Sequence, residues 1–379
     1  MDNSSRNIPI VTVEQFTKII EMQYKEGLMR PIFGLGRGGI GKTESIIDLA
    51  IKMGIGHIDI RLLMYNEGDL KGIPYPNENH TFTIWLQNNI LPRIERDGER
   101  GFLVLDEITS VPKSIRTAAY QLLNERKLGE YILPKGWMVI CLGNGEDDGG
   151  DYQGMEGNFL NRCSVLNVVQ TVESWKTWAM RSDINYLVTG YVSWRESDLH
   201  TYDPNSESEL LFASPRSWKA VSDILNRNEY DENDPILNAR ILSNLGTRVG
   251  HQFIAYCKYK NSIVHPDDII EGKPVRDVGD NLEILFMTMQ SLIKVMSDLI
   301  STDKKNHGDI TKGTMQKCAN GIRWILSLKA LEHKTMGLKD FISTHGQIVR
   351  KMIVNPEFSV MCPELSEFAK NNSILFKRQ

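Results

Sequence analysis

The glycine-rich run at residues 36–43 has the sequence Gly-Arg-Gly-Gly-Ile-Gly-Lys-Thr, which fits the phosphate-loop pattern G-x-x-x-x-G-K-[ST]. Glycines let such a loop turn its backbone N–H groups inward as an anion-binding nest, and the helix that follows adds its N-terminal dipole. We expect Lys42 to bridge the β- and γ-phosphates and Thr43 to hold Mg²⁺ through its hydroxyl. The backbone expected to cradle the phosphates belongs to Gly36, Gly38, Gly39, Ile40 and Gly41. The alternative is a glycine-rich turn without a ligand, which the low chance frequency of the pattern disfavours.

A second group follows about sixty residues later, where the apolar run Phe102–Leu105 leads into Asp106 and Glu107. This pattern predicts a buried strand with two carboxylates at its carboxyl end, where open α/β sheets bind ligands. Asp106 suits the Mg²⁺ shell, directly or through water. Glu107 suits the general base that orients an attacking water. A strand that ends in Asp-Glu is common by itself, and the preceding phosphate loop is what favours the functional interpretation.

A third apolar run, Trp137–Leu142, leads into Gly143-Asn144-Gly145. An asparagine at the carboxyl end of such a strand could reach the γ-phosphate or the attacking water. By local chemistry alone, a turn-forming asparagine between glycines is favoured.

These groups require a sheet that brings several strand ends together. From Ile8 to about Asn167, short β-like runs alternate with helical patterns, which predicts an α/β fold with a parallel sheet and crossover helices. Helices are expected at Val13–Lys25, Lys42–Met53 and Ser114–Arg126. Strands are expected at Arg30–Gly34, His57–Leu62, Phe102–Asp106, Trp137–Leu142 and Val165–Val169.

After about Thr171 the pattern becomes helical. The apolar residues of Leu282–Ile300 follow the three-or-four spacing of a helix that is buried on more than one side. Glu283, Gln290, Lys294 and Asp298 within it argue against a membrane span, and Met1–Ile10 lacks the features of a signal peptide.

The composition is that of a globular protein with two domains, or three small ones, in 379 residues. A net charge of −4 and a pI near 6.1 provide no bulk attraction to nucleic acid or to an anionic membrane. The five cysteines are odd in number and widely spaced, without a C-x-x-C pair. This favours buried reduced thiols in a cytoplasmic protein over a zinc site or a disulfide framework.

Together these motifs resemble the AAA+ superfamily and, within it, the MoxR-like ATPases. Gly36–Thr43 matches Walker A, Phe102–Glu107 matches Walker B, and Asn144 matches the sensor 1 asparagine, here followed by Gly145 rather than the more usual proline. Asp69–Pro74 is similar to the family's D-x-x-G-x-P segment. Ala118–Trp137 is similar to its helix and hairpin before sensor 1.

The resemblance also points to two arginines. Phe159–Cys163 is similar to the arginine-finger segment, which implies that Arg162 reaches the γ-phosphate of a neighbouring subunit. Without the family, a solvated salt-bridge arginine is the favoured reading. Ser214–Trp218 is similar to the sensor 2 motif at the start of a lid helix. Ser214 is a good N-cap and Pro215 a good first helical residue, so Arg216 would lie where a cation opposes the helix dipole unless an anion compensates it.

The resemblance implies a P-loop NTPase core in residues 1–170, a helical lid in 171–260 and a C-terminal helical extension of unknown role in 261–379. It also implies ATP hydrolysis with Mg²⁺ by a homo-oligomeric ring, expected to be a hexamer. The ring would act as a MoxR-like chaperone that remodels or activates a client protein, one class of which carries a von Willebrand factor A domain. A nucleic-acid-handling AAA+ motor is the alternative, which the acidic pI disfavours. A third alternative, a nucleotide-gated scaffold without turnover, is disfavoured by the Asp106-Glu107 pair.

Overall fold

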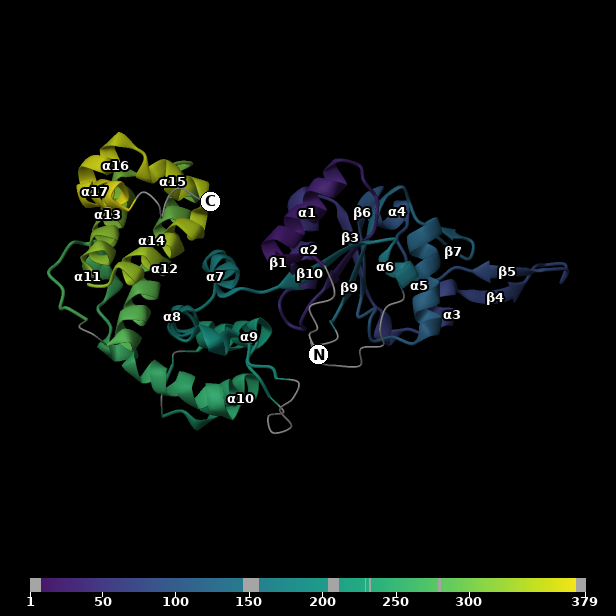
Figure 1. The fold of residues 1–379 in the computed structure, drawn as a ribbon, viewed down its shortest axis with the longest axis horizontal. Helices are drawn as coiled ribbons and strands as arrows, with labels where there is room; N and C mark the ends of the chain where they lie inside the picture. Colours follow the sequence, from purple (N-terminus) through teal and green to yellow (C-terminus); the bar gives the residue numbers. More distant parts are fainter. Residues whose placement is uncertain are drawn as a thin grey trace. The chain divides into compact units, whose positions relative to one another are not determined.

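The computed structural model describes residues 8–372 apart from 146–156, 204–210, 229, 232, 279 and 280. The chain divides into two compact units, Met1–Thr171 and Val172–Gln379 (Figure 1). The first unit is built around a sheet and the second is helical. Each unit has its own hydrophobic clusters, so each is described by itself.

A six-stranded parallel sheet forms the centre of the first unit, with the strand order β1-β10-β2-β9-β6-β3. The strands are β1 (Ile10–Thr12), β2 (Ile32–Leu35), β3 (Gly56–Arg61), β6 (Arg100–Asp106), β9 (Gly136–Gly143) and β10 (Ser164–Val169). Strand β9 lies between β2, which leads into the phosphate loop, and β6, which ends at Asp106. Because all strands are parallel, their carboxyl ends meet at one edge of the sheet.

Helices cover both faces of this sheet, which explains why β6 is a continuous apolar run. Phe102 and Val104 pack with α1 (Val13–Lys25) and α2 (Lys42–Met53). Leu103 and Leu105 pack on the opposite face with α5 (Lys113–Glu125). The alternation follows the two-residue period of a strand.

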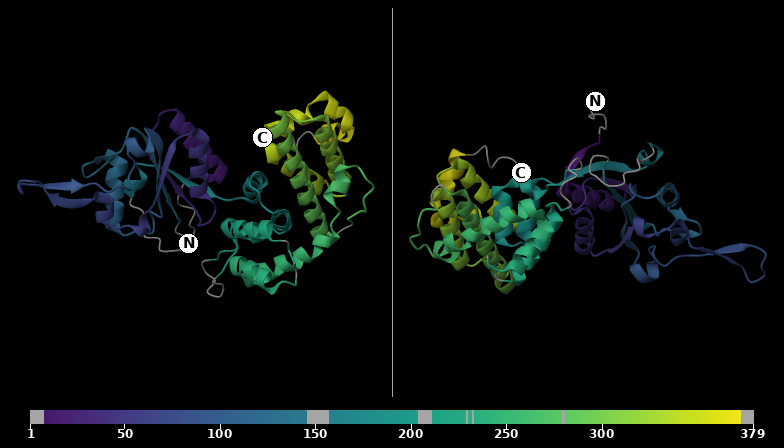
Figure 2. Two further views of the ribbon diagram at one scale, coloured as in Figure 1. Left: turned by 180° about the vertical axis from the view of Figure 1, so that it is seen from behind. Right: turned by 90° about the horizontal axis from the view of Figure 1, so that it is seen from below.

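Between β3 and β6 the chain forms a protruding hairpin that was not predicted from the sequence. It follows η1 (Leu62–Met64) and α3 (Glu67–Lys71), consists of β4 (Ile73–Pro76) and β5 (Thr83–Leu86), and is followed by α4 (Ile94–Asp97). The views in Figures 1 and 2 show it extending away from the rest of the first unit. Its exposed large apolar side chains are Ile73, Tyr75, Phe82, Trp85 and Leu86. A second, short hairpin of β7 (Lys127–Leu128) and β8 (Tyr131–Ile132) follows α5, as the family resemblance implied.

The second unit is formed by helices, and its buried apolar side chains make two clusters. One cluster joins the helices between Trp175 and Cys257, together with Met287, and the other spans Val264 to Leu365. The elements are α7 (Val172–Arg181), α8 (Tyr186–Trp194), η3 (Glu196–Leu199), α9 (Pro215–Arg227), α10 (Pro235–Cys257), η4 (Lys258–Ser262), α11 (Pro266–Ile270), α12 (Leu282–His307), α13 (Lys312–Ser327), α14 (Leu331–His345), α15 (Gln347–Ile353), α16 (Pro356–Met361) and α17 (Pro363–Asn371). Their division into a lid and an extension stays a prediction.

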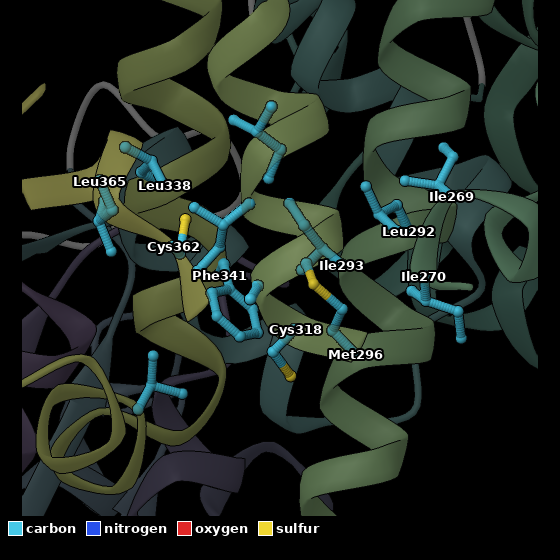
Figure 3. Close-up of a cluster of buried hydrophobic side chains, with 14 of the residues drawn as sticks. Ile269, Ile270, Leu292, Ile293, Met296, Cys318, Leu338, Phe341, Cys362 and Leu365 are labelled. Carbon is cyan, nitrogen blue, oxygen red and sulfur yellow. The ribbon is translucent and has the colours of Figure 1, made fainter. Parts of the chain in front are cut away.

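Helix α12 is the centre of the second unit. It is long and apolar enough to cross a membrane by length and composition, but 67% of its most apolar window is buried. Figure 3 shows Ile293 and Met296 of α12 beside Cys318 of α13 and Phe341 of α14. Met287 is fully buried as well and belongs to the other cluster. The helix is therefore buried on more than one side, as predicted.

A buried ion pair crosses the second unit. The Lys176 ammonium on α7 lies 2.9 Å from Oδ2 of Asp340 on α14, and both side chains are at most 10% exposed. Gln290 of α12 donates from Nε2 to the same carboxylate oxygen at 2.7 Å. Three helices distant in sequence are thus joined at one carboxylate.

The five cysteines are all buried and unpaired. Burial raises the pKa of the Cys163 thiol to about 12 and that of Cys362 to about 11. The thiolate is the nucleophilic form, so these two side chains act as small apolar core residues near neutral pH.

The predicted fold class is confirmed. The first unit is an α/β core with a six-stranded parallel sheet and helices on both faces, and a helical region follows it, as predicted.

Candidate functional site

The phosphate loop leaves the sheet at Gly36, a position where no side chain fits. A Cβ at Gly36 would lie 2.1 Å from the carbonyl oxygen of Val168 on the neighbouring strand β10. On the other side, the Gly36 N–H donates to the carbonyl of Gly143 at the end of β9, at 3.1 Å. The start of the loop is therefore fixed by the backbones of two flanking strands.

Lys42 is the first residue of α2 and is only 7% exposed. Its ammonium donates to the carbonyl oxygens of Gly36 and, at 2.8 Å, Arg37, so the side chain runs back along the loop. Within the described residues, no side chain caps the first turn of α2, whose N-cap is Gly41 in the left-handed region. Uncapped N–H groups beside a lysine form a site that suits phosphate oxygens.

The two halves of the predicted nucleotide site meet at Thr43 and Asp106. The Thr43 hydroxyl donates to Asp106 Oδ2 at 2.8 Å, although the residues are 63 positions apart. The other oxygen, Oδ1, accepts the backbone N–H of Glu107 at 2.8 Å. Both oxygens of Asp106 are thus oriented by neighbouring groups, and the hydroxyl and carboxylate face each other across the carboxyl ends of β2 and β6.

The donor groups at this edge suit a hard divalent cation. Mg²⁺ takes oxygen ligands, and protein sites usually supply one or two carboxylates beside the substrate phosphates. Asp59 on β3 carries a buried Oδ1 without a hydrogen-bond partner among the described residues. Its pKa is raised, first by burial and then by the negative charge of Asp106, while Arg61 lowers it. The carboxylates of Asp59 and Asp106 therefore lie close enough to interact, and Thr43 and Asp106 fit as Mg²⁺ ligands.

Glu107 lies in a backbone conformation that favours glycine. Its φ is +62°, in the left-handed region, which costs a residue with a Cβ roughly 1–2 kcal/mol. The surrounding turn holds it there: the Ile108 N–H donates to the carbonyl of Leu142 at 3.1 Å, and the Ser110 N–H to that of Glu107 at 3.0 Å. Strain of this kind is concentrated at active sites, where the rest of the structure maintains it.

Asn144 lies beside the phosphate loop. Its Oδ1 is 4.0 Å from the position that a Cβ on Gly38 would take. Its backbone N–H donates to Oγ1 of Thr109 at 3.1 Å. The structure therefore brings Asn144 together with the loop. Its role toward a γ-phosphate or a water stays a prediction.

Arg162 is exposed in the turn between α6 (Gly157–Leu160) and β10. The turn is fixed by Arg30, whose Nη2 donates to the carbonyls of Asn161 at 2.7 Å and Cys163 at 3.2 Å. Among the described residues, no hydrogen bond or ion pair joins Arg162 to the phosphate loop of its own chain. Its function as a finger stays a prediction.

Arg216 belongs to the second unit, and its local setting is as predicted. Ser214 is the N-cap of α9, accepts the Ser217 N–H at 3.3 Å in a capping box, and is followed by Pro215 in the first turn. Arg216 is exposed in that turn. Its approach to the phosphate loop stays a prediction.

Two residues close to the site were missed from the sequence, Asp59 and Thr109. Asp59 is the one carboxylate in the alternating run His57–Leu62, and a carboxylate within a predicted strand was a usable signal. Thr109 follows Glu107 by two residues and carries no signal in a single sequence, because its partner Asn144, the residue after β9, is 35 positions away.

No protein-family model matches the chain. Among solved structures, it is similar to a protein of Cytophaga hutchinsonii with a provisional ATPase assignment, with 12% identity over 66% of this chain and 81% of that chain and a TM-score of 0.33. It is also similar to the RuvB Holliday junction branch migration motor of Thermotoga maritima, with 10% identity over 91% of this chain and 89% of that chain and a TM-score of 0.32. Likeness at this level does not extend to function.

Proposed function

We propose that this chain is a Mg²⁺-dependent ATPase of the AAA+ type. The observation that carries the proposal is the hydrogen bond between Thr43 and Asp106, with Glu107 held in a strained conformation directly beside it. A phosphate loop alone would support nucleotide binding. A carboxylate pair placed against the loop's hydroxyl supports hydrolysis as well.

In the proposed reaction, Lys42 and the backbone N–H groups of the loop bind the phosphates. Thr43 and Asp106 would hold Mg²⁺, which would supply positive charge against the phosphate oxygens. Glu107 orients a water molecule for in-line attack and accepts its proton. Asn144, whose amide oxygen lies near Gly38, helps to position that water or the γ-phosphate.

The proposal includes a homo-oligomeric ring, for which we expect six subunits. Arg162 is exposed on a turn that Arg30 holds in place, which suits a cation presented to a neighbouring subunit. An arginine supplied in this way can raise the rate by several powers of ten. Arg216, at the start of α9, would contact the γ-phosphate from the lid, and the phosphate charge would compensate the unfavourable position of this cation against the helix dipole.

We further propose that the ring remodels or activates a client protein in the cytoplasm, as its resemblance to the MoxR-like ATPases implies. The acidic chain, with a net charge of −4, lacks the bulk positive charge that nucleic-acid binding favours. A client with a von Willebrand factor A domain is the class to test first.

The test compares three variants in ATP binding and turnover. Lys42→Ala should lose ATP binding, and Glu107→Gln should bind ATP but hydrolyse it at least about a hundredfold more slowly. Arg162→Ala subunits mixed with Glu107→Gln subunits should recover activity, because an intact finger would then face an intact base in some interfaces. Normal ATP turnover by Lys42→Ala or Glu107→Gln would refute the assignment. Stimulation of turnover by DNA would replace the chaperone with the nucleic-acid motor.

A further inference from the structure

Thr109 is fully buried in the turn that follows Glu107. Its Oγ1 accepts the backbone N–H of Asn144 at 3.1 Å. The same side chain lies so close to Gly143 that a Cβ there would be 2.6 Å from Thr109 Cγ2 and 2.7 Å from Oγ1. A single threonine therefore contacts both Gly143, the last residue of β9, and Asn144, which follows it.

Two hydrogen bonds connect the turn of β6 to the end of β9. One joins backbone groups, from the Ile108 N–H to the carbonyl of Leu142 at 3.1 Å. In the other, the backbone N–H of Asn144 donates to Oγ1 of Thr109. Beyond them, the carbonyl of Gly143 accepts the N–H of Gly36 at the start of the phosphate loop. Of these three hydrogen bonds, the one to Thr109 is the bond that a side-chain substitution can remove.

We propose that Thr109 is a positioning residue that sets Asn144 relative to Glu107 for the hydrolytic step. The inference rests on the proposed ATPase function and assigns no contact between Thr109 and the nucleotide. Reaction rates depend steeply on geometry, and a misplacement of about 1 Å can cost about a hundredfold. A residue that acts only through Asn144 should change kcat, because the phosphate-binding groups of the loop stay in place.

The decisive variant is Thr109→Val, which keeps the shape of the side chain and removes the hydroxyl. We expect kcat to fall about tenfold, with KM for ATP within about twofold of the wild type. Thr109→Ser keeps the hydroxyl and should retain kcat within about threefold. Thr117→Val is the matched control, since it makes the same chemical change at an exposed threonine of α5, and it should leave both constants unchanged.

A double-mutant cycle with Asn144→Ala separates positioning from general stability. If Thr109 acts through the Asn144 side chain, Thr109→Val in the Asn144→Ala background should lower kcat by less than about twofold. If Thr109→Val fails to fold, Thr109→Ala, which also lacks the hydroxyl but is smaller, takes its place in the cycle.

Wild-type kcat in Thr109→Val, or the full tenfold loss in the Asn144→Ala background, would overturn the inference while leaving the ATPase intact. The proposed function is tested separately, by comparing ATP turnover in the wild type and in Lys42→Ala. If the wild-type protein has no ATP turnover, or if Lys42→Ala does not reduce it, the proposed function is refuted and this inference with it.

Discussion

Replacing Lys176 by methionine should destabilise the second unit strongly. Lys176 on α7 and Asp340 on α14 form an ion pair in which neither side chain is more than 10% exposed. Methionine fills a similar volume and removes the ammonium. The Asp340 carboxylate would then be left buried without its cation.

The magnitude follows from this burial. Removing one partner of a buried pair costs about 3–5 kcal/mol, because the remaining charge is uncompensated. Gln290 still donates to Asp340 at 2.7 Å, and a hydrogen bond to a charged group contributes about 1.5–3 kcal/mol. We therefore expect the lower end of the range, about 3 kcal/mol.

Urea unfolding followed by tryptophan fluorescence is the assay, since Trp175 and Trp178 lie on the same helix as Lys176. Lys219→Met is the matched control. Lys219 pairs with Asp223 on the surface of α9, where the side chains are 50% and 48% exposed, so its loss should cost less than about 0.5 kcal/mol. The double variant Lys176→Met/Asp340→Leu should be more stable than Lys176→Met alone, because no buried charge remains.

A loss below about 1 kcal/mol in Lys176→Met would show that the pair is not desolvated as its burial indicates. A double variant less stable than the single one would contradict the reasoning on the uncompensated charge.

Three further predictions concern the first unit. Glu107→Gly should be more stable than Glu107→Gln by up to about 1.5 kcal/mol, because relief of the left-handed strain, roughly 1–2 kcal/mol, is set against an entropic cost of glycine of about 0.5–1 kcal/mol. Urea midpoints in the opposite order would count against strain. Gly36→Ala should destabilise the unit by about 1–3 kcal/mol and abolish ATP binding in an equilibrium titration, since its Cβ would lie 2.1 Å from the Val168 carbonyl oxygen. Unchanged ATP binding would mean that the loop can accommodate this Cβ beside β10. Asp59 has a pKa raised above the ordinary 3.8, so the folded state binds the proton more tightly and wild-type stability falls as pH rises from about 4 through the raised pKa. In the absence of Mg²⁺, the Tm of Asp59→Asn minus that of the wild type should therefore increase as the pH rises across this range. A Tm difference that does not change with pH would contradict the raised pKa of Asp59.

Helix boundaries were predictable where periodicity and caps agree. Helices α1 and α2 begin and end at the predicted residues, since Thr12 forms a capping box at the start of α1 and Gly54 takes the left-handed conformation after α2. The five predicted strands of the core deviate by at most two residues at either end, because buried parallel strands are largely apolar runs, whereas the three-residue strand β1 was not predicted. The meeting of Thr43 with Asp106 followed from the rule that parallel strands present their carboxyl ends at one edge.

Other features depend on spatial neighbours that one sequence does not show. Thr109 contacts Asn144 only because β6 and β9 are adjacent in the sheet. The positive φ of Glu107 contradicts the local preference of glutamate, so local rules predict the opposite. The β4–β5 hairpin was missed because Pro74 and Pro76 argue against a strand.

Those two prolines have a consequence for how copies of the chain meet. The Asn77 N–H donates inward to Phe82 at 3.0 Å, so alternate residues of β4 pair with β5, and the amide positions of Pro74 and Pro76 face outward. Proline has no N–H, so the outer edge of β4 lacks two of the donors that a further strand would need. A strand from another copy of the chain therefore cannot pair fully with the outer edge of β4. The hairpin can be apolar and protruding on every copy without β4 acting as a template for fibre-like self-association.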